Sequence, residues 1–214
     1  MLGAGGHGSE LHSYMLDLAA AGKLVPQLVG FLDDSRPSGP WLTTTLLGKL
    51  DRLRELTQDR KHEALNYITA VGDNDTRRRM VRTVEALELQ NLCAWTLQHP
   101  SVHVGFDVRL GAGTLLAPGV VITTRVHIGA HCILNVQASI SHDCIIRDFA
   151  NINPGAVICG NVSIGQGAYI GAGATIINKI SIGDWAVIGA GAVVIRDVPA
   201  GATAVGVPAR VIKT

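Results

Sequence analysis

The chain opens with Met1-Leu2-Gly3-Ala4-Gly5-Gly6-His7-Gly8, a glycine pattern that could bind phosphate. It matches the form G-x-G-x-x-G, in which the glycines make a tight turn that leads into a helix. Backbone N–H groups at such a turn attract an anion, and the helix dipole favours its negative charge. The simpler alternative is a turn that only lets a strand and a helix pack closely. The pattern by itself therefore leaves a phosphate site and a packing turn open.

Two carboxylates, Asp33 and Asp34, follow the next apolar segment and could bind sugar hydroxyls or a base edge. They lie 25 residues or more beyond Gly8, which is later than a dinucleotide site expects. Only Met1 and Leu2 precede the glycines, so the strand that usually leads into such a turn is almost absent.

The elements that would position these residues alternate between strand and helix. Apolar spacing predicts a helix directly after the glycine turn. It also predicts strands over residues 28–32 and 67–71, and helices over residues 45–56 and 76–89. This alternation indicates a small parallel sheet, and thus a Rossmann-like α/β domain over residues 1–98.

Composition excludes several classes of protein. Lys and Arg number 18 against 17 Asp and Glu, and the one basic run, Arg77-Arg78-Arg79, is typical of a solvated helix face, so no nucleic-acid partner is expected. There is no signal peptide and no apolar run of membrane-spanning length, so we expect no membrane insertion and a cytoplasmic location. The four cysteines lack metal-ligand spacing, so no metal site is predicted.

The second half of the chain is a six-residue repeat. Ile, Leu or Val recurs without interruption at sixteen positions: 104, 110, 116, 122, 128, 134, 140, 146, 152, 158, 164, 170, 176, 182, 188 and 194. Four residues after most of these comes a compact residue, such as Ala138 or Cys144. Each six-residue unit has room only for one short strand and a corner, so residues 99–214 are predicted to form stacked coils.

The repeat resembles that of the hexapeptide-repeat acyltransferases, whose fold is a left-handed parallel β-helix with three hexapeptides per coil. The whole chain resembles bacterial sugar acetyltransferases, from the glycine-rich opening to the tail Val205-Gly206-Val207-Pro208-Ala209-Arg210. That group is related to sialic-acid O-acetyltransferases and to N-acetyltransferases of nucleotide-linked 4-amino-4,6-dideoxy sugars of the bacillosamine and perosamine type. The most specific local match runs from Ile133-Leu134-Asn135 to Ser141-His142-Asp143-Cys144.

The resemblance implies transfer of an acetyl group from acetyl-CoA to a sugar amine. Because an ammonium has no lone pair, the reaction needs a base, and the resemblance places His142 in that role with Asp143 supporting it. Asn135 falls at a family position that contacts the sugar. Without the resemblance, His142 would be an ordinary exposed histidine on a β-helix wall.

Further contacts are implied by the same resemblance. The nucleotide would lie at Gly3, Gly5, Gly6, His7 and Gly8, together with Asp33, Asp34, Asn74 and Arg77. Coenzyme A would run past Asn151, Gly160, Gly171, Ala172, Ala190, Gly206 and Pro208. Many relatives carry a second histidine where this chain has Asn151; an asparagine can still donate a hydrogen bond to a developing oxyanion, but it cannot act as a base.

Assembly is expected as well. Residues 131–146 carry few charges besides Asp143, so one wall of the coils looks more apolar than a monomer exposes. In the family that the chain resembles, three prisms pack around a three-fold axis with acetyl-CoA between neighbours. We therefore expect a homotrimer.

Other functions remain open at this point. A sugar O-acetyltransferase would need the same base with a hydroxyl acceptor. A carbonic anhydrase on the same fold needs three convergent histidines around zinc, a spacing that His127, His131 and His142 do not show. A non-catalytic binding protein is disfavoured by the intact His142-Asp143 pair. The sequence does not choose among UDP, GDP and dTDP, or name the sugar.

Overall fold

The computed structural model describes residues 1–213 and contains two compact units, Met1–Trp95 and the residues from Thr96 onward. The first unit is built of α1 (Gly6–Ala20), β1 (Phe31–Leu32), β2 (Gly39–Trp41), β3 (Thr44–Gly48), a 3₁₀ helix (Leu50–Arg52), α2 (Leu53–Asp59), β4 (Leu65–Tyr67), α3 (Asn74–Glu85) and β5 (Leu92–Ala94). Strand β1 pairs in parallel with β3, and β4 pairs in parallel with β5. These pairings confirm the α/β architecture.

The short segment before the glycine turn takes the place of a first strand. Leu2 makes parallel bridges to both Leu32 and Thr69. Its N–H donates to the Ile68 carbonyl at 2.9 Å, and the Gly3 N–H donates to the Leu32 carbonyl at 2.8 Å. Leu2 is 1% exposed, so a single residue joins β1 to the segment after β4.

The prediction of a helix over residues 45–56 is wrong for the first half of that range. Residues Thr44–Gly48 form β3, which pairs with β1 in parallel and with β2 in antiparallel. The apolar residues in this stretch are close enough together to fit either a helix or a strand followed by a helix. Gly48, with φ of +135°, ends the strand, and helix begins only after it.

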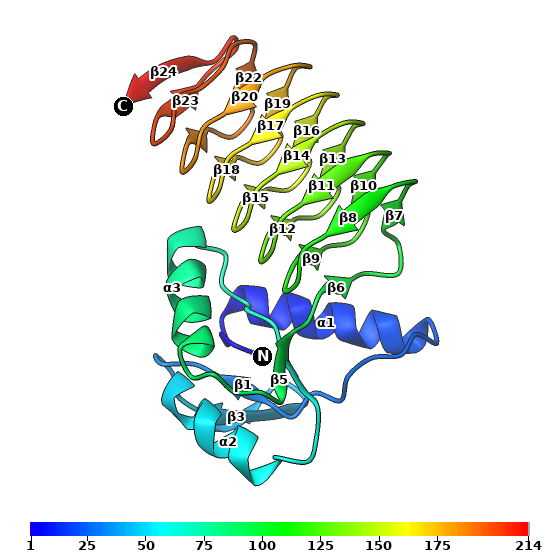
Figure 1. Cartoon of the computed structure of the whole chain (residues 1–214), viewed down its shortest axis with the longest axis vertical. Helices are drawn as coiled ribbons and strands as arrows, with labels where there is room; N and C mark the ends of the chain where they lie inside the picture. Colours follow the sequence, from blue (N-terminus) through cyan, green and yellow to red (C-terminus); the bar gives the residue numbers. More distant parts are fainter. Residues whose placement is uncertain (214) are drawn as a thin grey trace. The chain divides into compact units, whose positions relative to one another are not determined.

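The second unit is a parallel β-helix of three sheets (Figure 1). One sheet has eight strands: β6 (Leu97–Gln98), β9 (Leu115–Leu116), β12 (Ile133–Leu134), β15 (Asn151–Ile152), β18 (Tyr169–Ile170), β21 (Val187–Ile188), β23 (Thr203–Val205) and β24 (Arg210–Lys213). A second has six: β7 (His103–Val104), β10 (Val121–Ile122), β13 (Ser139–Ile140), β16 (Val157–Ile158), β19 (Thr175–Ile176) and β22 (Val193–Val194). The third has five: β8 (Val108–Leu110), β11 (Val126–Ile128), β14 (Ile145–Ile146), β17 (Ser163–Ile164) and β20 (Ser181–Ile182).

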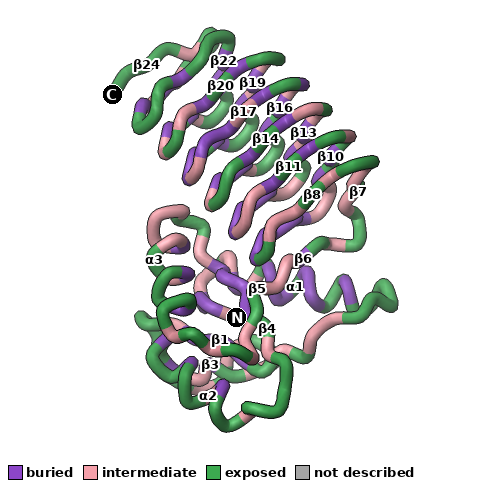
Figure 2. The backbone as a smooth tube through the Cα atoms, viewed as in Figure 1, coloured by how far each residue is buried: buried purple, intermediate pink, exposed green. Residues whose placement is uncertain are grey.

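Three hexads make one coil, so in the hexad region a strand residue pairs with the residue eighteen positions further along, as Leu134 does with Ile152. The last turn is shorter, and Val187 pairs with Thr203. The aliphatic residue of a hexad points into the prism, where Ile152, Ile158 and Ile164 have no exposed surface. The compact residues are also buried, including Ala138 and Cys144. Figure 2 shows these buried positions recurring in coil after coil.

Candidate active site

His142 and Asp143 occupy the corner between β13 of the six-stranded sheet and β14 of the five-stranded sheet. Asp143 adopts the left-handed conformation with φ of +60°, which turns the chain sharply and brings its carboxylate beside the preceding ring. His142 Nδ1 lies 2.7 Å from Asp143 Oδ2. The His142 side chain is about half exposed, at 52%, and no hydrogen bond to Nε2 occurs within residues 1–213. The contact with Asp143 therefore leaves Nε2 without a hydrogen-bond partner among the described residues.

Arg125 completes this corner from the preceding coil. Its Nε donates to Asp143 Oδ1 at 2.7 Å, and its Nη2 donates to Asp143 Oδ2 at 3.0 Å. The pKa of Asp143 is lowered to about 2, mainly by the hydrogen bonds from Arg125 and next by the hydrogen bond with His142. The carboxylate thus stays ionised at neutral pH. Sequence reasoning missed Arg125, although its position eighteen residues before Asp143 places it directly beneath in the coil.

Gly160 lies at the same corner one coil further on, between β16 and β17. A Cβ built on Gly160 would meet the ring of His142. The structure therefore brings together His142, Asp143 and Gly160, three of the residues singled out from the sequence.

The expected sugar contact and most of the other expected coenzyme contacts lie at a different edge of the prism. Asn135, expected to contact the sugar, and the expected coenzyme contacts Gly171, Ala172 and Ala190 stand at corners between the eight-stranded and six-stranded sheets. The Asn135 side chain accepts from the Val136 N–H, whereas Ala172 and Ala190 are exposed. Gly206 and Pro208 lie in the turn between β23 and β24. Within one chain these residues and His142 are on separate edges.

Asn151 lies on the outer face of the eight-stranded sheet. It begins β15, pairs in register with Ile133 and Tyr169, and is only 2% exposed. The structure does not bring it to the corner that holds His142.

The glycine turn combines two close-packed glycines with two that face open space. A Cβ on Gly3 would lie 2.8 Å from the Ala70 carbonyl oxygen, and one on Gly8 would lie 2.6 Å from the Gly3 carbonyl oxygen, so these two glycines serve close packing. Gly5 and Gly6 face open space at the start of α1. The turn is therefore packed on one side and open on the other.

The two carboxylates after β1 are held by the backbone. Asp33 Oδ2 accepts from the Ala4 N–H at 2.7 Å, and Asp33 Oδ1 accepts from the N–H and hydroxyl of Ser35. Burial acts to raise the pKa of Asp33, but these hydrogen bonds outweigh it and leave the pKa below its usual value. Asp34 Oδ1 accepts from the Leu50 N–H at 2.9 Å. Asp33 thus fixes the glycine turn, whereas Asp34 fixes the start of the 3₁₀ helix.

The remaining expected nucleotide contacts differ in how accessible they are. His7 Nδ1 lies 3.0 Å from Glu10 Oε2, and burial lowers the pKa of His7. Asn74 begins α3 and is partly exposed. Arg77 is 1% exposed, and its Nη1 donates to the Val71 carbonyl at 3.0 Å. In the structure its guanidinium therefore binds the backbone just before α3.

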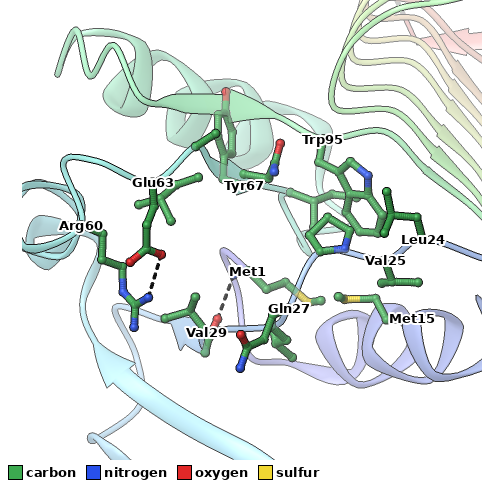
Figure 3. A pocket seen from close by; sticks show the side chains of 17 residues that line it. Met1, Met15, Leu24, Val25, Gln27, Val29, Arg60, Glu63, Tyr67 and Trp95 are labelled. Carbon is green, nitrogen blue, oxygen red and sulfur yellow. Dashed lines mark hydrogen bonds and ion pairs between the residues drawn. The ribbon is translucent and has the colours of Figure 1, made fainter. Parts of the chain in front are cut away.

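A pocket of about 490 Å³ in the first unit lies apart from the glycine turn (Figure 3). Met15, Leu24, Val25 and Trp95 give it largely apolar walls, and the Arg60–Glu63 ion pair lies at its side. None of the expected nucleotide contacts lines it. A phosphate needs N–H donors, which the start of a helix such as α1 offers and the apolar walls of this pocket do not.

The described residues contain neither a metal-binding cluster nor a membrane-spanning helix. Residues 1–213 contain no group of three or more His, Cys, Asp and Glu side chains able to hold a metal ion. No helix in the same range is long and apolar enough to cross a membrane.

Family models match both halves of the chain. The model described as the PglD N-terminal domain matches residues 1–84. The model described as bacterial transferase hexapeptide (six repeats) matches residues 143–178 and 161–196. No curated protein sequence matches the chain significantly.

Solved structures match over almost the full length. A mutant of perosamine N-acetyltransferase from Caulobacter crescentus, in complex with CoA and GDP-perosamine, is 30% identical with a TM-score of 0.87, and the match covers 100% of this chain and 95% of that one. WeeI from Acinetobacter baumannii AYE is 31% identical with a TM-score of 0.82, covering 99% and 97%. The acetyltransferase domain of PglB from Neisseria gonorrhoeae FA1090, in complex with acetyl coenzyme A, is 28% identical with a TM-score of 0.82, covering 99% and 97%.

Proposed function

This chain belongs to the PglD-type hexapeptide-repeat acetyltransferases, and we propose that it N-acetylates a nucleotide-linked 4-amino-4,6-dideoxy sugar with His142 as the general base. The observation that carries the proposal is the corner at which Asp143 engages Nδ1 of His142 and leaves Nε2 free to accept a proton. The relatives with known ligands support the substrate class, since one holds CoA with GDP-perosamine and another holds acetyl coenzyme A.

The chemistry follows from this arrangement. The neutral sugar amine attacks the thioester carbonyl of acetyl-CoA, and His142 Nε2 takes the proton that the amine loses. The tetrahedral intermediate then collapses with cleavage of the carbon–sulfur bond, and the departing thiolate takes the proton from the imidazolium. The ionised Asp143 stabilises the imidazolium that forms between the two steps. The products are the acetamido sugar and free CoA.

Each end of the sugar nucleotide has a proposed binding region. The diphosphate of the sugar nucleotide would bind the open side of the glycine turn at Gly5 and Gly6, and Asn135 would contact the sugar. Coenzyme A would bind along the edge that carries Ala172 and Ala190.

The test is a CoA-release assay with GDP-, UDP- and dTDP-linked amino sugars, each paired with its 4-hydroxy counterpart. We expect release with one of the amino sugars and none with its hydroxyl counterpart. His142→Ala should lower kcat by about 10²–10⁴-fold. His127→Ala, at an exposed histidine of the five-stranded sheet, is the matched control and should keep the wild-type rate.

The outcomes separate the alternatives. Release with the hydroxyl sugars instead would make the chain an O-acetyltransferase that uses the same base. Near wild-type turnover in folded His142→Ala protein would disprove the assignment of the base.

A further inference from the structure

Gly160 makes room for the imidazole of His142. A Cβ built on Gly160 would lie 2.6 Å from both Cε1 and Nε2 of His142, and 3.1 Å from Nδ1. Real Cβ atoms almost never approach other atoms this closely. The ring therefore lies in space that any residue other than glycine would fill.

The backbone does not require glycine at this position. Gly160 is absent from the residues with positive φ, so an alanine could adopt its conformation without strain. The same corner position holds Thr124 one coil before His142 and Asn178 one coil after Gly160. Side chains are thus accommodated at this corner in neighbouring coils. What is particular to Gly160 is the histidine against which it lies.

The ring is fixed on a second side by the carboxylate. Asp143 holds Nδ1 at 2.7 Å, and the two Arg125 hydrogen bonds hold the carboxylate in turn. Because the side chain of His142 is 52% exposed, no wall of packed side chains limits its rotation. Gly160 and Asp143 together define the one orientation seen here.

We propose that Gly160 is a positioning residue for the base, whose missing side chain lets the His142 ring lie flat on the next coil with Nδ1 engaged by Asp143. This inference rests on the proposed function, in which Nε2 of that ring accepts the proton. A methyl group at Gly160 would push the ring outward and break the contact to Asp143. Nε2 would then be misplaced, and the fixed tautomer would be lost.

The direct test measures the ring rather than the reaction. In nitrogen-resolved NMR spectra of the full chain above pH 8, wild-type His142 should show mainly the tautomer with the proton on Nδ1. Gly160→Ala should give a mixture of both tautomers, and its crystal structure should show the ring displaced from Asp143. Asn178→Ala, at the same corner one coil further on, is the matched control and should match wild type. An unchanged tautomer and ring position in Gly160→Ala would overturn the inference.

Kinetics then show whether Gly160 acts through His142. Gly160→Ala should lower kcat by about 10-fold or more, because small displacements of a reacting group are costly. Added to His142→Ala, the same substitution should cause no further loss in the residual rate. An equal loss in both backgrounds would mean that Gly160 acts on coenzyme binding instead, which overturns the inference.

The two proposals fail in different ways. If the tautomer changes in Gly160→Ala while His142→Ala keeps its activity, Gly160 does position the His142 ring but His142 is not the base. If His142→Ala is inactive while the tautomer of Gly160→Ala is unchanged, the assignment of His142 as the base is supported and the positioning role of Gly160 is disproved.

Discussion

Four residues from three successive coils meet at the corner of the candidate base. Arg125 lies below Asp143, and Gly160 lies above His142, each eighteen positions away in the sequence. The motif around His142 predicted that His142 and Asp143 act as a pair, and the structure shows their side chains in contact at 2.7 Å. The two neighbours were not predicted as its partners, because that requires converting the six-residue period into a stack of coils. The same spacing applies to any residue of interest in this unit.

Removal of Arg125 should change the acid-base properties of Asp143. We expect Arg125→Gln to raise the pKa of Asp143 from about 2 toward its ordinary value, because two charge-assisted hydrogen bonds to the carboxylate are weakened. A carbon-13 NMR titration of the carboxyl group measures this. Arg109→Gln, at another exposed arginine one coil lower, is the control and should leave the titration unchanged.

The lowered pKa of Asp143 also determines how the stability of the fold depends on pH. The ion pair contributes to folding above about pH 4, the ordinary carboxyl value, and that contribution is lost as the pH falls toward 2. Because the pair is exposed, the effect on unfolding is expected to be small. A titration of Asp143 that is identical in wild type and Arg125→Gln would contradict the geometry at this corner.

The elements differ in how far the sequence specifies them. The hexads predict the coils from residue 104 to residue 194, because one aliphatic position and one compact position repeat there and no competing period exists. The stretch that became β3 and α2 was misassigned, since Leu46, Leu47, Leu50 and Leu53 fit a helical spacing as well as the observed strand followed by helix. Pairing with β1 decided between them, and a pairing across a sheet cannot be read from local spacing.

The glycine turn is an element whose shape depends on one side chain. Asp33 holds the Ala4 N–H at 2.7 Å, so Asp33→Ala should loosen the turn and raise the sugar-nucleotide KM about tenfold, while the acetyl-CoA KM stays the same. Steady-state kinetics with each substrate varied in turn measures both values. Asp148→Ala removes a comparable carboxylate contact to the Ala130 N–H in the β-helix, and serves as the control.

A second measurement separates binding from folding in this case. Thermal unfolding of Asp33→Ala should show a loss of stability of about 1–2 kcal/mol, because a backbone donor loses its partner. If stability falls while both KM values stay at the wild-type level, the turn is a packing feature and the nucleotide binds elsewhere.

At the scale of the molecule, the candidate residues are divided between two edges of one prism. His142, Asp143 and Gly160 lie between the six-stranded and five-stranded sheets, whereas Ala172 and Ala190 lie between the eight-stranded and six-stranded sheets. Exposed apolar residues occur on all three sheets, at Val121 and Val157, at Ile145, and at Tyr169 and Val187. A site that needs both edges is complete only when a neighbouring prism supplies the second edge.

We therefore expect a homotrimer with three shared sites. Light scattering should give about three times the 22.5 kDa chain mass. Neither His142→Ala, which lacks the base, nor Ala172→Trp, which fills the coenzyme edge, should be active alone. Coexpressed in equal amounts, they should restore about a quarter of wild-type activity, because a quarter of the interfaces then combine an intact edge from each chain.

The control for this mixing experiment is a double variant, His142→Ala with Ala172→Trp, coexpressed with wild type in equal amounts. Here an interface is intact only when wild type supplies both edges, which again happens in a quarter of random pairings. If each chain instead carried a whole site, this mixture would keep half of the wild-type activity and the two single variants together would restore none. Those two results, or a fully active monomer, would rule out a shared site and leave the separation of the two edges without a catalytic consequence.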